Sequence, residues 1–375
     1  MSTRAPTSYE DFAGELRACG ESGTCARVVG GGTKIGWGRG GAPADLELST
    51  SELDEILEHN EGDLTAILQA GVPLARAQEK FAEADQMLAL DPPDTGGATI
   101  GGVVAAGDSG PLRHRYGAAR DLVLGVAVAL PDGTVARAGG KVIKNVAGYD
   151  LAKLFAGSFG TLGAIVEVAV RLHPMRPTAS AEGHGSDPAA VARAATALAH
   201  SRLEAQALDV AWRGGQGGVL VRFAGVEAEP QADAARRELE KAGLESSVMH
   251  DDASAWEAQR TAQRGELVVR VSGLQTRLED VLRAAEELDG GVVGRAALGI
   301  CWVSLPASAG AEEVRALRRS LAPAACVVLD APEELRREVD PWGFDDGGAL
   351  ELMRRTKARF DPNGVCSPGV FVGGI

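Results

Sequence analysis

The chain has 375 residues, of which 45% are hydrophobic and 4% aromatic, so it is long enough for two domains with full cores. Its 52 acidic and 38 basic residues give a formal net charge of −14, which repels nucleic acids and anionic lipids over most of the surface. The scarcity of aromatic residues also excludes a base-stacking platform, so no nucleic-acid partner is expected.

The first half of the chain alternates predicted strands and helices, which is typical of an α/β layer. Ser49 and Glu52 fit a capping box, which predicts a helix over residues 53–60. Residues 173–187 contain three prolines and no clear period, which predicts a linker. Hydrophobic periodicity predicts further helices over 8–18, 73–84 and 145–155, and strands over 26–29, 45–49, 64–69, 121–130, 134–137 and 163–172.

The second half reads as β-α-β units placed side by side, which predicts a ferredoxin-like sandwich. A final helix over 348–359 leads into a turn-rich tail, Phe360-Asp-Pro-Asn-Gly-Val-Cys-Ser-Pro-Gly369. The predicted strands are 206–212, 218–223, 266–272, 299–304 and 325–329, and the predicted helices are 227–241, 275–288 and 311–321.

Two glycine-rich segments are the strongest signal for a binding site. The first is Arg27-Val-Val-Gly-Gly-Gly-Thr-Lys34, and the second is Ala98-Thr-Ile-Gly-Gly-Val-Val-Ala-Ala-Gly-Asp-Ser-Gly110. A glycine run after a short apolar stretch can bring bare backbone N–H groups against a phosphate. Two such runs therefore predict a grip on a diphosphate from two sides.

The commonest nucleotide-binding loops do not fit these segments. Gly36-Trp-Gly-Arg-Gly-Gly41 has the spacing G-x-G-x-x-G, but a proline and a strand-like run follow it instead of the helix of a Rossmann fold. No Walker sequence G-x-x-x-x-G-K-[S/T] occurs in the chain. A plain surface loop stays an equal alternative for Gly30–Gly32 taken alone, so the combination of segments carries the interpretation.

A third segment, Gly157-Ser-Phe-Gly-Thr-Leu-Gly-Ala-Ile-Val-Glu-Val168, completes a known set. With it, residues 26–172 resemble the FAD-binding domain of the vanillyl-alcohol oxidase/para-cresol methylhydroxylase flavoproteins. In that family the first two loops hold the FAD pyrophosphate, and the third segment passes beside the adenine. The resemblance implies an α+β fold: a two-part FAD-binding domain (1–177), a smaller ferredoxin-like α/β sandwich (178–340), and a C-terminal helix and tail (341–375) that return to the FAD domain.

Other segments make the chain similar to the FAD-binding subunits of bacterial glycolate oxidase. They are Arg115-Tyr-Gly117, Asp121-Leu-Val-Leu-Gly125, Lys144-Asn-Val-Ala-Gly-Tyr-Asp-Leu151 and the tail 360–369. The similarity covers nearly the whole chain and is weakest between residues 178 and 340. It implies a complex with a larger flavoprotein subunit and an iron–sulfur subunit, which oxidises glycolate, a small 2-hydroxy acid, to glyoxylate and passes the electrons to a partner.

The resemblance also implies which residues contact FAD. Many relatives tether FAD through a histidine in or near the first loop, and residues 27–37 contain none, which favours noncovalent FAD. The implied FAD-binding residues are Gly30, Gly31, Gly32, Thr33, Lys34, Pro92, Thr99, Ile100, Gly101, Gly102, Ser109, Gly110, Lys144, Gly163 and Ile165.

Candidate catalytic residues follow the second glycine-rich segment. A 2-hydroxy acid needs a cation for its carboxylate and a base for its hydroxyl proton, while hydride passes to the flavin. Arg113, His114 and Arg115 offer both, although they are alternatively counter-charges for the pyrophosphate or members of surface ion pairs. The larger catalytic relatives carry an H-x-G-D-G-N-x-H run that this chain lacks, so no metal site is expected.

Whether glycolate is oxidised on this chain or on its partner therefore stays open, and the missing run favours the partner. The sequence keeps two alternatives: a self-sufficient FAD-dependent 2-hydroxy acid dehydrogenase resembling D-lactate dehydrogenases, and a non-catalytic scaffold. No C-x-x-C pair occurs among the five cysteines, which argues against an iron–sulfur or zinc site and fits a reducing cytoplasm. We expect a cytoplasmic chain, because no signal peptide or spanning segment is evident, with any attachment to the inner membrane made through the complex.

Overall fold

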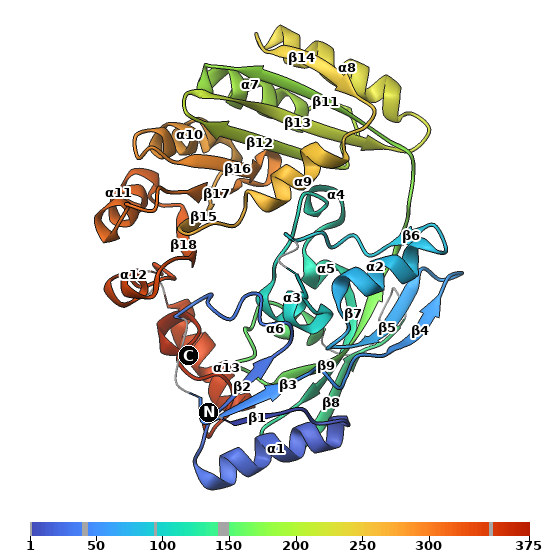
Figure 1. Ribbon diagram of the computed structural model, residues 1–375, viewed down its shortest axis with the longest axis vertical. Helices are drawn as coiled ribbons and strands as arrows, with labels where there is room; N and C mark the ends of the chain where they lie inside the picture. The colour runs from blue at the N-terminus through green and yellow to red at the C-terminus, as the bar shows by residue number, and fades with distance from the viewer. Residues whose placement is uncertain (1, 40–43, 94–95, 142–149, 345–347) are drawn as a thin grey trace. The chain divides into compact units, whose positions relative to one another are not determined.

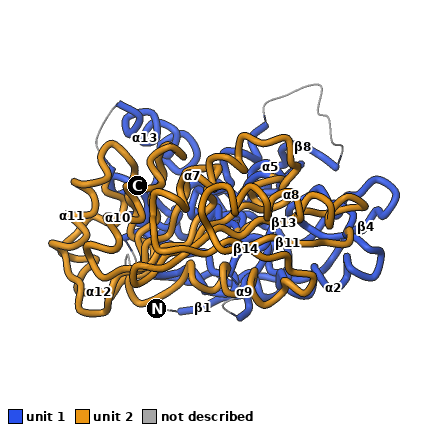
Figure 2. Tube along the Cα trace, turned by 90° about the horizontal axis from the view of Figure 1, so that it is seen from above, with its two compact units in different colours: residues 1–109, 117–175, 344–375 blue, residues 110–116, 176–343 orange. Residues whose placement is uncertain are grey.

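The computed structural model describes residues 2–39, 44–93, 96–141, 150–344 and 348–375. The chain forms two compact units (Figure 2). Unit 1 comprises residues 1–109, 117–175 and 344–375, and unit 2 comprises residues 110–116 and 176–343. Within the described ranges, no helix is both long and apolar enough to cross a lipid bilayer.

Unit 1 is built on small sheets (Figure 1). The largest is antiparallel, with the order β4 (Ile56–Asn60), β5 (Thr65–Gln69), β9 (Ala164–Arg171), β7 (Val123–Ala129) and β8 (Val135–Gly139). A parallel sheet has the order β1 (Ser2–Arg4), β3 (Leu46–Ser49) and β2 (Ala26–Val29), and β10 (His173–Pro174) pairs with β6 (Gln86–Met87). The helices are α1 (Tyr9–Ser22), α2 (Leu74–Ala82), α3 (Ile100–Ala106), α5 (Ala119–Leu122), α6 (Ala152–Phe155), α13 (Ala349–Phe360) and the 3-10 helix η3 (Val372–Gly374).

Helix α1 joins the two larger sheets of unit 1 into one core. Its N-cap Ser8 accepts a hydrogen bond from the N–H of Asp11, and Phe12 and Leu16, spaced by one helical turn, are fully buried. These side chains belong to one apolar cluster with residues of β3, β7 and β9. The cluster also includes Cys366, so the C-terminal tail is part of the same core.

Unit 2 is one antiparallel sheet made of two βαββαβ halves. The first half contains β11 (Thr178–Gly185), α7 (Pro188–Ala199), β12 (Ala207–Arg213), β13 (Gln216–Ala224), α8 (Ala228–Lys241) and β14 (Glu245–Met249). The second contains β15 (Val268–Ser272), η1 (Gln275–Arg277), α10 (Leu278–Glu286), β16 (Gly291–Arg295), η2 (Ala296–Leu298), β17 (Ile300–Ser304), α11 (Ala311–Leu321) and β18 (Ala325–Asp330). Helix α9 (Ala253–Thr261) connects the halves, and α4 (Arg113–Tyr116) and α12 (Glu333–Glu338) complete the unit.

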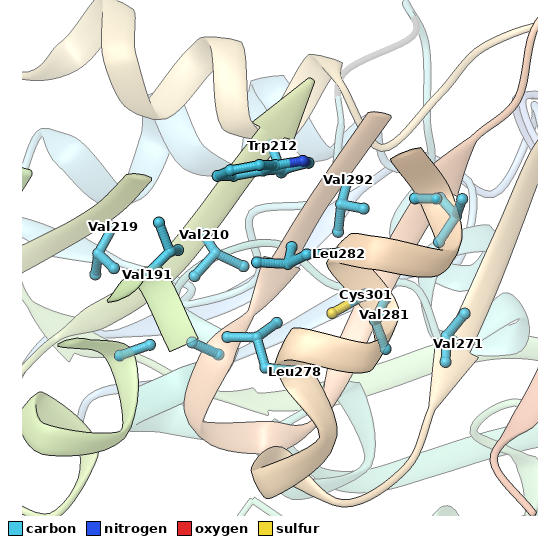
Figure 3. Close-up of a cluster of buried hydrophobic side chains, with 14 of the residues drawn as sticks. Val191, Val210, Trp212, Val219, Val271, Leu278, Val281, Leu282, Val292 and Cys301 are labelled. Atoms are coloured by element: carbon cyan, nitrogen blue, oxygen red, sulfur yellow. The ribbon is translucent and has the colours of Figure 1, made fainter. Parts of the chain in front are cut away.

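The strand order confirms the predicted ferredoxin-like architecture. It is β14-β11-β13-β12-β16-β17-β15-β18, which repeats the ferredoxin-like order in each half and joins the halves through β12 and β16. Side chains of α7 and α10 pack on one face of this sheet against Val210, Trp212 and Val292 (Figure 3). Trp256 of α9 is fully buried against Ala207 and Leu220, which alternate with the residues of that face and so lie on the opposite one.

Two predicted elements are wrong. The helix predicted over residues 53–60 is instead strand β4, which pairs with β5 at the edge of the sheet, with Ile56 opposite Leu68. The linker predicted over 173–187 contains β10 and β11. The core-facing residues of β11 are small (Ala179, Ala181 and Gly183), and a Cβ on Gly183 would lie 3.1 Å from Leu239 Cβ of α8. Because α8 packs closely on β11, these positions hold small residues, and the sequence shows little of the hydrophobic alternation that predicts a strand.

Candidate functional site

A cleft in unit 1 brings the glycine-rich segments together. It encloses about 880 Å³, which includes space open to solvent. Its walls come from the loop after β2, from α3, from the segment before β9 and from the C-terminal tail. The lining residues are Arg27, Val28, Val29, Gly30, Gly31, Gly32, Thr33, Lys34, Ile35, Trp37, Thr50, Ala70, Thr99, Gly101, Gly102, Ala105, Ala106, Phe159, Gly160, Gly163, Ala164, Ile165, Ser367 and Val370.

The first loop needs glycine at Gly30 and Gly31 because its backbone packs directly against the second loop. A Cβ on Gly30 would lie 2.1 Å from Thr99 Oγ1, and one on Gly31 would lie 1.7 Å from the carbonyl oxygen of Gly97. Gly32 has φ +69°, in the left-handed region that favours glycine. Across the described part of the chain, no protein group accepts a hydrogen bond from the N–H of Gly31 or Gly32. These amides are therefore available to an anionic ligand.

The N–H groups of the second loop mainly donate hydrogen bonds to other groups of the protein. Thr99 caps α3 by accepting a hydrogen bond from the N–H of Gly102 at 3.3 Å. The N–H of Ile100 donates to the carbonyl of Val72 (2.9 Å), and that of Gly101 donates to the carbonyl of Ala70 (2.8 Å). A Cβ on Gly101 would lie 2.6 Å from Ala70 Cβ. Gly101 is thus required for close packing on Ala70, whether or not a phosphate approaches it.

The third segment and the C-terminal tail close the cleft from another side. Gly163 has φ +150°, and a Cβ there would lie 2.9 Å from Val128 Cγ1, so the segment runs tightly over β7. The tail adds an isolated parallel bridge between Ala26 and Cys366, beside β2. The N–H of Ser367 donates to the carbonyl of Ala26 at 2.8 Å. This pairing places Ser367 at the cleft wall.

A buried carboxylate holds that tail in place. Asp361 is 2% exposed and accepts hydrogen bonds from the N–H groups of Val365 (2.9 Å) and Cys366 (2.7 Å). Lys357 Nζ donates to the same carboxylate at 2.6 Å and to the carbonyl oxygens of Thr161 (2.7 Å) and Cys366 (2.9 Å). One ion pair therefore joins α13, the tail and the segment that precedes β9.

Lys34, which lines the cleft, belongs to a buried ion pair. Lys34 Nζ lies 3.2 Å from Asp108 Oδ2, and the two side chains are only 7% and 4% exposed. Asp108 Oδ1 accepts a hydrogen bond from the N–H of Ser109 at 2.9 Å. Asp108 Oδ2 accepts no hydrogen bond from a described group, so the ammonium of Lys34 is what compensates its charge. The pair joins the first glycine loop to the segment that follows α3.

The predicted catalytic residues lie on α4, which belongs to unit 2. Arg115 Nη2 lies 3.3 Å from Glu204 Oε2 in an exposed ion pair. His114 is partly buried, and its Nδ1 has no hydrogen-bond partner among the described residues. Burial, together with the nearby Arg115, lowers the pKa of His114, so its imidazole is neutral at pH 7. Their catalytic role stays a prediction.

Other predicted FAD contacts do not line the cleft. Ile100 is fully buried in the protein interior, and Pro92 and Ser109 are also buried. Gly110 belongs to unit 2, and Lys144 falls outside the described residues. The sequence did not single out Trp37, Phe159, Ser367 or Val370 as site residues, although Trp37, Phe159 and Ser367 lie within quoted segments. Asp108, which also lies within a quoted motif, was missed because nothing local indicates its distant partner.

Comparison with known proteins relates the N-terminal part of the chain to FAD-binding proteins. Residues 3–139 match the family model for the FAD binding domain. The chain is 35% identical over 174 residues to glycolate oxidase subunit GlcD of Bacillus subtilis, which covers 46% of this chain and 37% of the relative. It is 42% identical over 126 residues to glycolate oxidase subunit GlcE of Escherichia coli, which covers 33% of this chain and 36% of the relative. The matches thus span little more than a third of each relative.

The fold comparison extends over both units. The chain superposes on alkyldihydroxyacetonephosphate synthase with a TM-score of 0.71 and 15% identity, over 98% of this chain and 76% of that one. At this identity the likeness concerns the fold alone. The cleft fits FAD chemically, because it offers unpaired glycine amides for a pyrophosphate and an apolar wall of alanines, Ile165 and Val370 for the rings.

Proposed function

We propose that this chain, whose unit 1 contains an FAD-binding domain, is the FAD-binding subunit of an oxidoreductase that acts on a small 2-hydroxy acid such as glycolate. One observation carries the proposal: the glycine-lined cleft unites all three segments on which the resemblance rests. The matched relatives that are named glycolate oxidase subunits support the substrate class. We further propose that FAD is held noncovalently, since residues 27–37 contain no histidine.

The residues of the chain have separate tasks in this proposal. FAD, when bound, would accept the hydride of the C–H bond, which carries both electrons of the oxidation. Gly31 and Gly32 bind the pyrophosphate through their N–H groups, and the apolar wall excludes water from the rings. If the substrate is oxidised on this chain, as the second candidate below requires, Arg113 and Arg115 bind its carboxylate, for which the guanidinium fork is suited. In that case neutral His114 accepts the hydroxyl proton at Nδ1, the atom without a partner in the described structure.

We propose that the electrons then leave to partner subunits, a larger flavoprotein and an iron–sulfur protein. Among the described residues, no group of three or more His, Cys, Asp and Glu side chains is arranged to hold a metal. Two curated relatives are named as subunits, which supports a shared assembly. A second candidate is a self-sufficient dehydrogenase, which is favoured by the presence of a neutral base and two arginines on α4.

The visible spectrum of the purified chain tests the proposal. We expect a yellow protein whose flavin band persists when glycolate is added without oxygen, and bleaches once the larger flavoprotein subunit is added. Bleaching of the isolated chain by glycolate or D-lactate would establish the self-sufficient dehydrogenase instead. A colourless chain that does not take up added FAD would contradict both and indicate a scaffold.

A further inference from the structure

We infer that unit 2 carries a second small-molecule site, which binds a short organic carboxylate that also bears a hydroxyl or amino hydrogen-bond donor. The site is a cleft between the C-terminal part of α9 and strands β12, β16 and β17. It encloses about 650 Å³, which includes space open to solvent. None of its lining residues lines the FAD cleft, so the inference does not depend on the proposed function.

Arg213 supplies the positive charge of this site. It lies opposite Gly291 in the β12–β16 register, and a Cβ on Gly291 would lie 2.8 Å from Arg213 Nε and Nη2. The guanidinium thus occupies the space that the missing side chain leaves. Its Nη2 donates to Ser304 Oγ at 2.7 Å, and this hydroxyl in turn lies 3.3 Å from the carbonyl oxygen of Gly291. The arginine is therefore held at the site although it is solvent-exposed.

The charge of Arg213 has no counterpart in the described structure. No described Asp or Glu side chain lies within ion-pair distance of it, and its only described acceptor is Ser304. Most of its N–H groups are thus open to a ligand, and a guanidinium binds a carboxylate with two parallel hydrogen bonds. In a chain with a net charge of −14, such an uncompensated cation in a cleft favours an anion.

Gln259 of α9 supplies a second polar group. The residue is 8% exposed, lines the cleft, and its Oε1 accepts no hydrogen bond from any described group. A buried acceptor left without a donor is unfavourable by about 1–3 kcal/mol, so such groups are usually explained by a ligand or a bound water. A hydroxyl or an amino group on the ligand would satisfy it. Chloride has the charge but no donor, and inorganic phosphate has no apolar body to contact the rest of the cleft.

The remaining walls of the cleft are largely apolar. Ala211 and Val293 come from the strands, Gly217 has no side chain, and Ala258 and Ala262 line the cleft from the helix side. These apolar walls suit the aliphatic body of an organic carboxylate. A carboxylate with one neighbouring donor on a short carbon chain uses all three features: Arg213, Gln259 and the apolar wall.

Calorimetric titration of the full chain with its flavin tests the inference. We expect saturable binding of D-lactate or D-alanine, and weaker binding of acetate, which lacks the donor. Arg213→Gln should weaken lactate binding by about tenfold or more, and Gln259→Leu should weaken it to the level of acetate. Arg237→Gln, which alters an exposed arginine of α8, serves as the control and should bind as the unaltered chain does.

A flavin-free variant separates this site from the flavin site. Gly31→Ala should release FAD yet leave the titration with lactate unchanged, because Gly31 does not line the second cleft. If binding disappears together with the flavin, the ligand belongs to the FAD cleft and the inference is wrong. It is equally wrong if Arg213→Gln, a change of an exposed side chain that is not expected to unfold the unit, binds as the unaltered chain does.

Discussion

Lys34 and Asp108 form an ion pair beside the glycine-lined cleft, with the ammonium 3.2 Å from the carboxylate and both side chains almost fully buried. Lys34 belongs to the first glycine loop, and Asp108 follows the helix that the second loop begins. The pair therefore ties the loop that binds the pyrophosphate in the proposed function to the segment that follows α3. It fixes the distance between them before any ligand arrives, which reduces the ordering that binding requires.

Removing one partner of this pair should be more harmful than removing both. Lys34→Met or Asp108→Asn leaves an uncompensated buried charge or dipole, and we expect each to lower the free energy of unfolding of unit 1 by about 3 kcal/mol. The double variant should lose less free energy of unfolding than the two single variants lose together. Urea unfolding of the flavin-free chain measures these free energies. Lys80→Met, in an exposed pair with Glu83, is the control and should change stability by less than about 1 kcal/mol.

Gly31→Ala should abolish FAD retention. The added methyl group would lie 1.7 Å from the carbonyl oxygen of Gly97, so the first loop must move away from the second. We expect FAD affinity to fall by at least about tenfold, which corresponds to 1.4 kcal/mol. Gly36→Ala in the same loop is the matched control, because a Cβ there meets nothing within 4 Å. Equal flavin content in the two purified variants would show that the contact between the loops does not shape the site.

The glycine-rich loops stand out in the sequence, although their contacts with FAD stay a prediction. A residue that has a left-handed φ, or that lies against another stretch of backbone, is almost always glycine, so Gly30–Gly32 and Gly163 attract notice without coordinates. The ion pairs are different. Lys357 and Asp361 are four residues apart, but the sequence does not show that their pair also reaches the carbonyl oxygen of Thr161. Lys34 with Asp108 depends on which loops meet in space, and nothing in the neighbouring sequence indicates the partner.

Strand β11 shows a second limit of sequence reasoning. Its buried positions are alanine and glycine because α8 packs closely on them, so the hydrophobic alternation that predicts a strand is nearly absent. Strand β4 is a related case. Its pairing with β5 at the sheet edge outweighs the local capping signal of Ser49 and Glu52, as tertiary context often does.

We expect Asp361→Asn to weaken the attachment of the C-terminal tail to unit 1. An asparagine has a single acceptor oxygen, so it cannot accept from the N–H groups of Val365 and Cys366 and from the Lys357 ammonium together. Lys357 also stays buried without its countercharge. We expect about 3–5 kcal/mol of destabilisation, together with faster proteolysis after residue 361 and weaker FAD binding, because Ser367 lines the cleft. Glu351→Gln changes an exposed carboxylate of the same helix and should leave proteolysis and flavin content unaltered.

The pH dependence of flavin reduction should report His114. Burial, with Arg115 nearby, lowers the pKa of this imidazole, so the free base persists below its ordinary range. If His114 accepts the substrate proton, the rate constant for anaerobic bleaching rises with pH on an acidic limb that lies below pH 6.5, the ordinary value. His114→Gln should remove that limb and slow bleaching by about 100-fold or more. An unchanged limb in the variant would assign the proton to another group.

The stability of unit 2 should fall as pH rises through the titration of Asp209. This carboxylate is fully buried, and burial raises its pKa to about 6 although Arg295 Nη1, which opposes the shift, lies 2.8 Å away. A raised carboxyl pKa means that the folded state binds the proton more tightly than the unfolded one, whose pKa is about 3.9. The resulting stabilisation is complete below about pH 4 and is lost as pH rises through about 6.

A difference measurement isolates this effect. The free energy of unfolding of the unaltered chain minus that of Asp209→Asn should decrease between about pH 4 and pH 6 by on the order of 3 kcal/mol, and stay constant above. In an Arg295→Met background the decrease should extend to higher pH and become larger, because the carboxyl loses the cation that opposes its desolvation. A shift to lower pH would show that Arg295 destabilises the carboxylate, contrary to the charges placed together here.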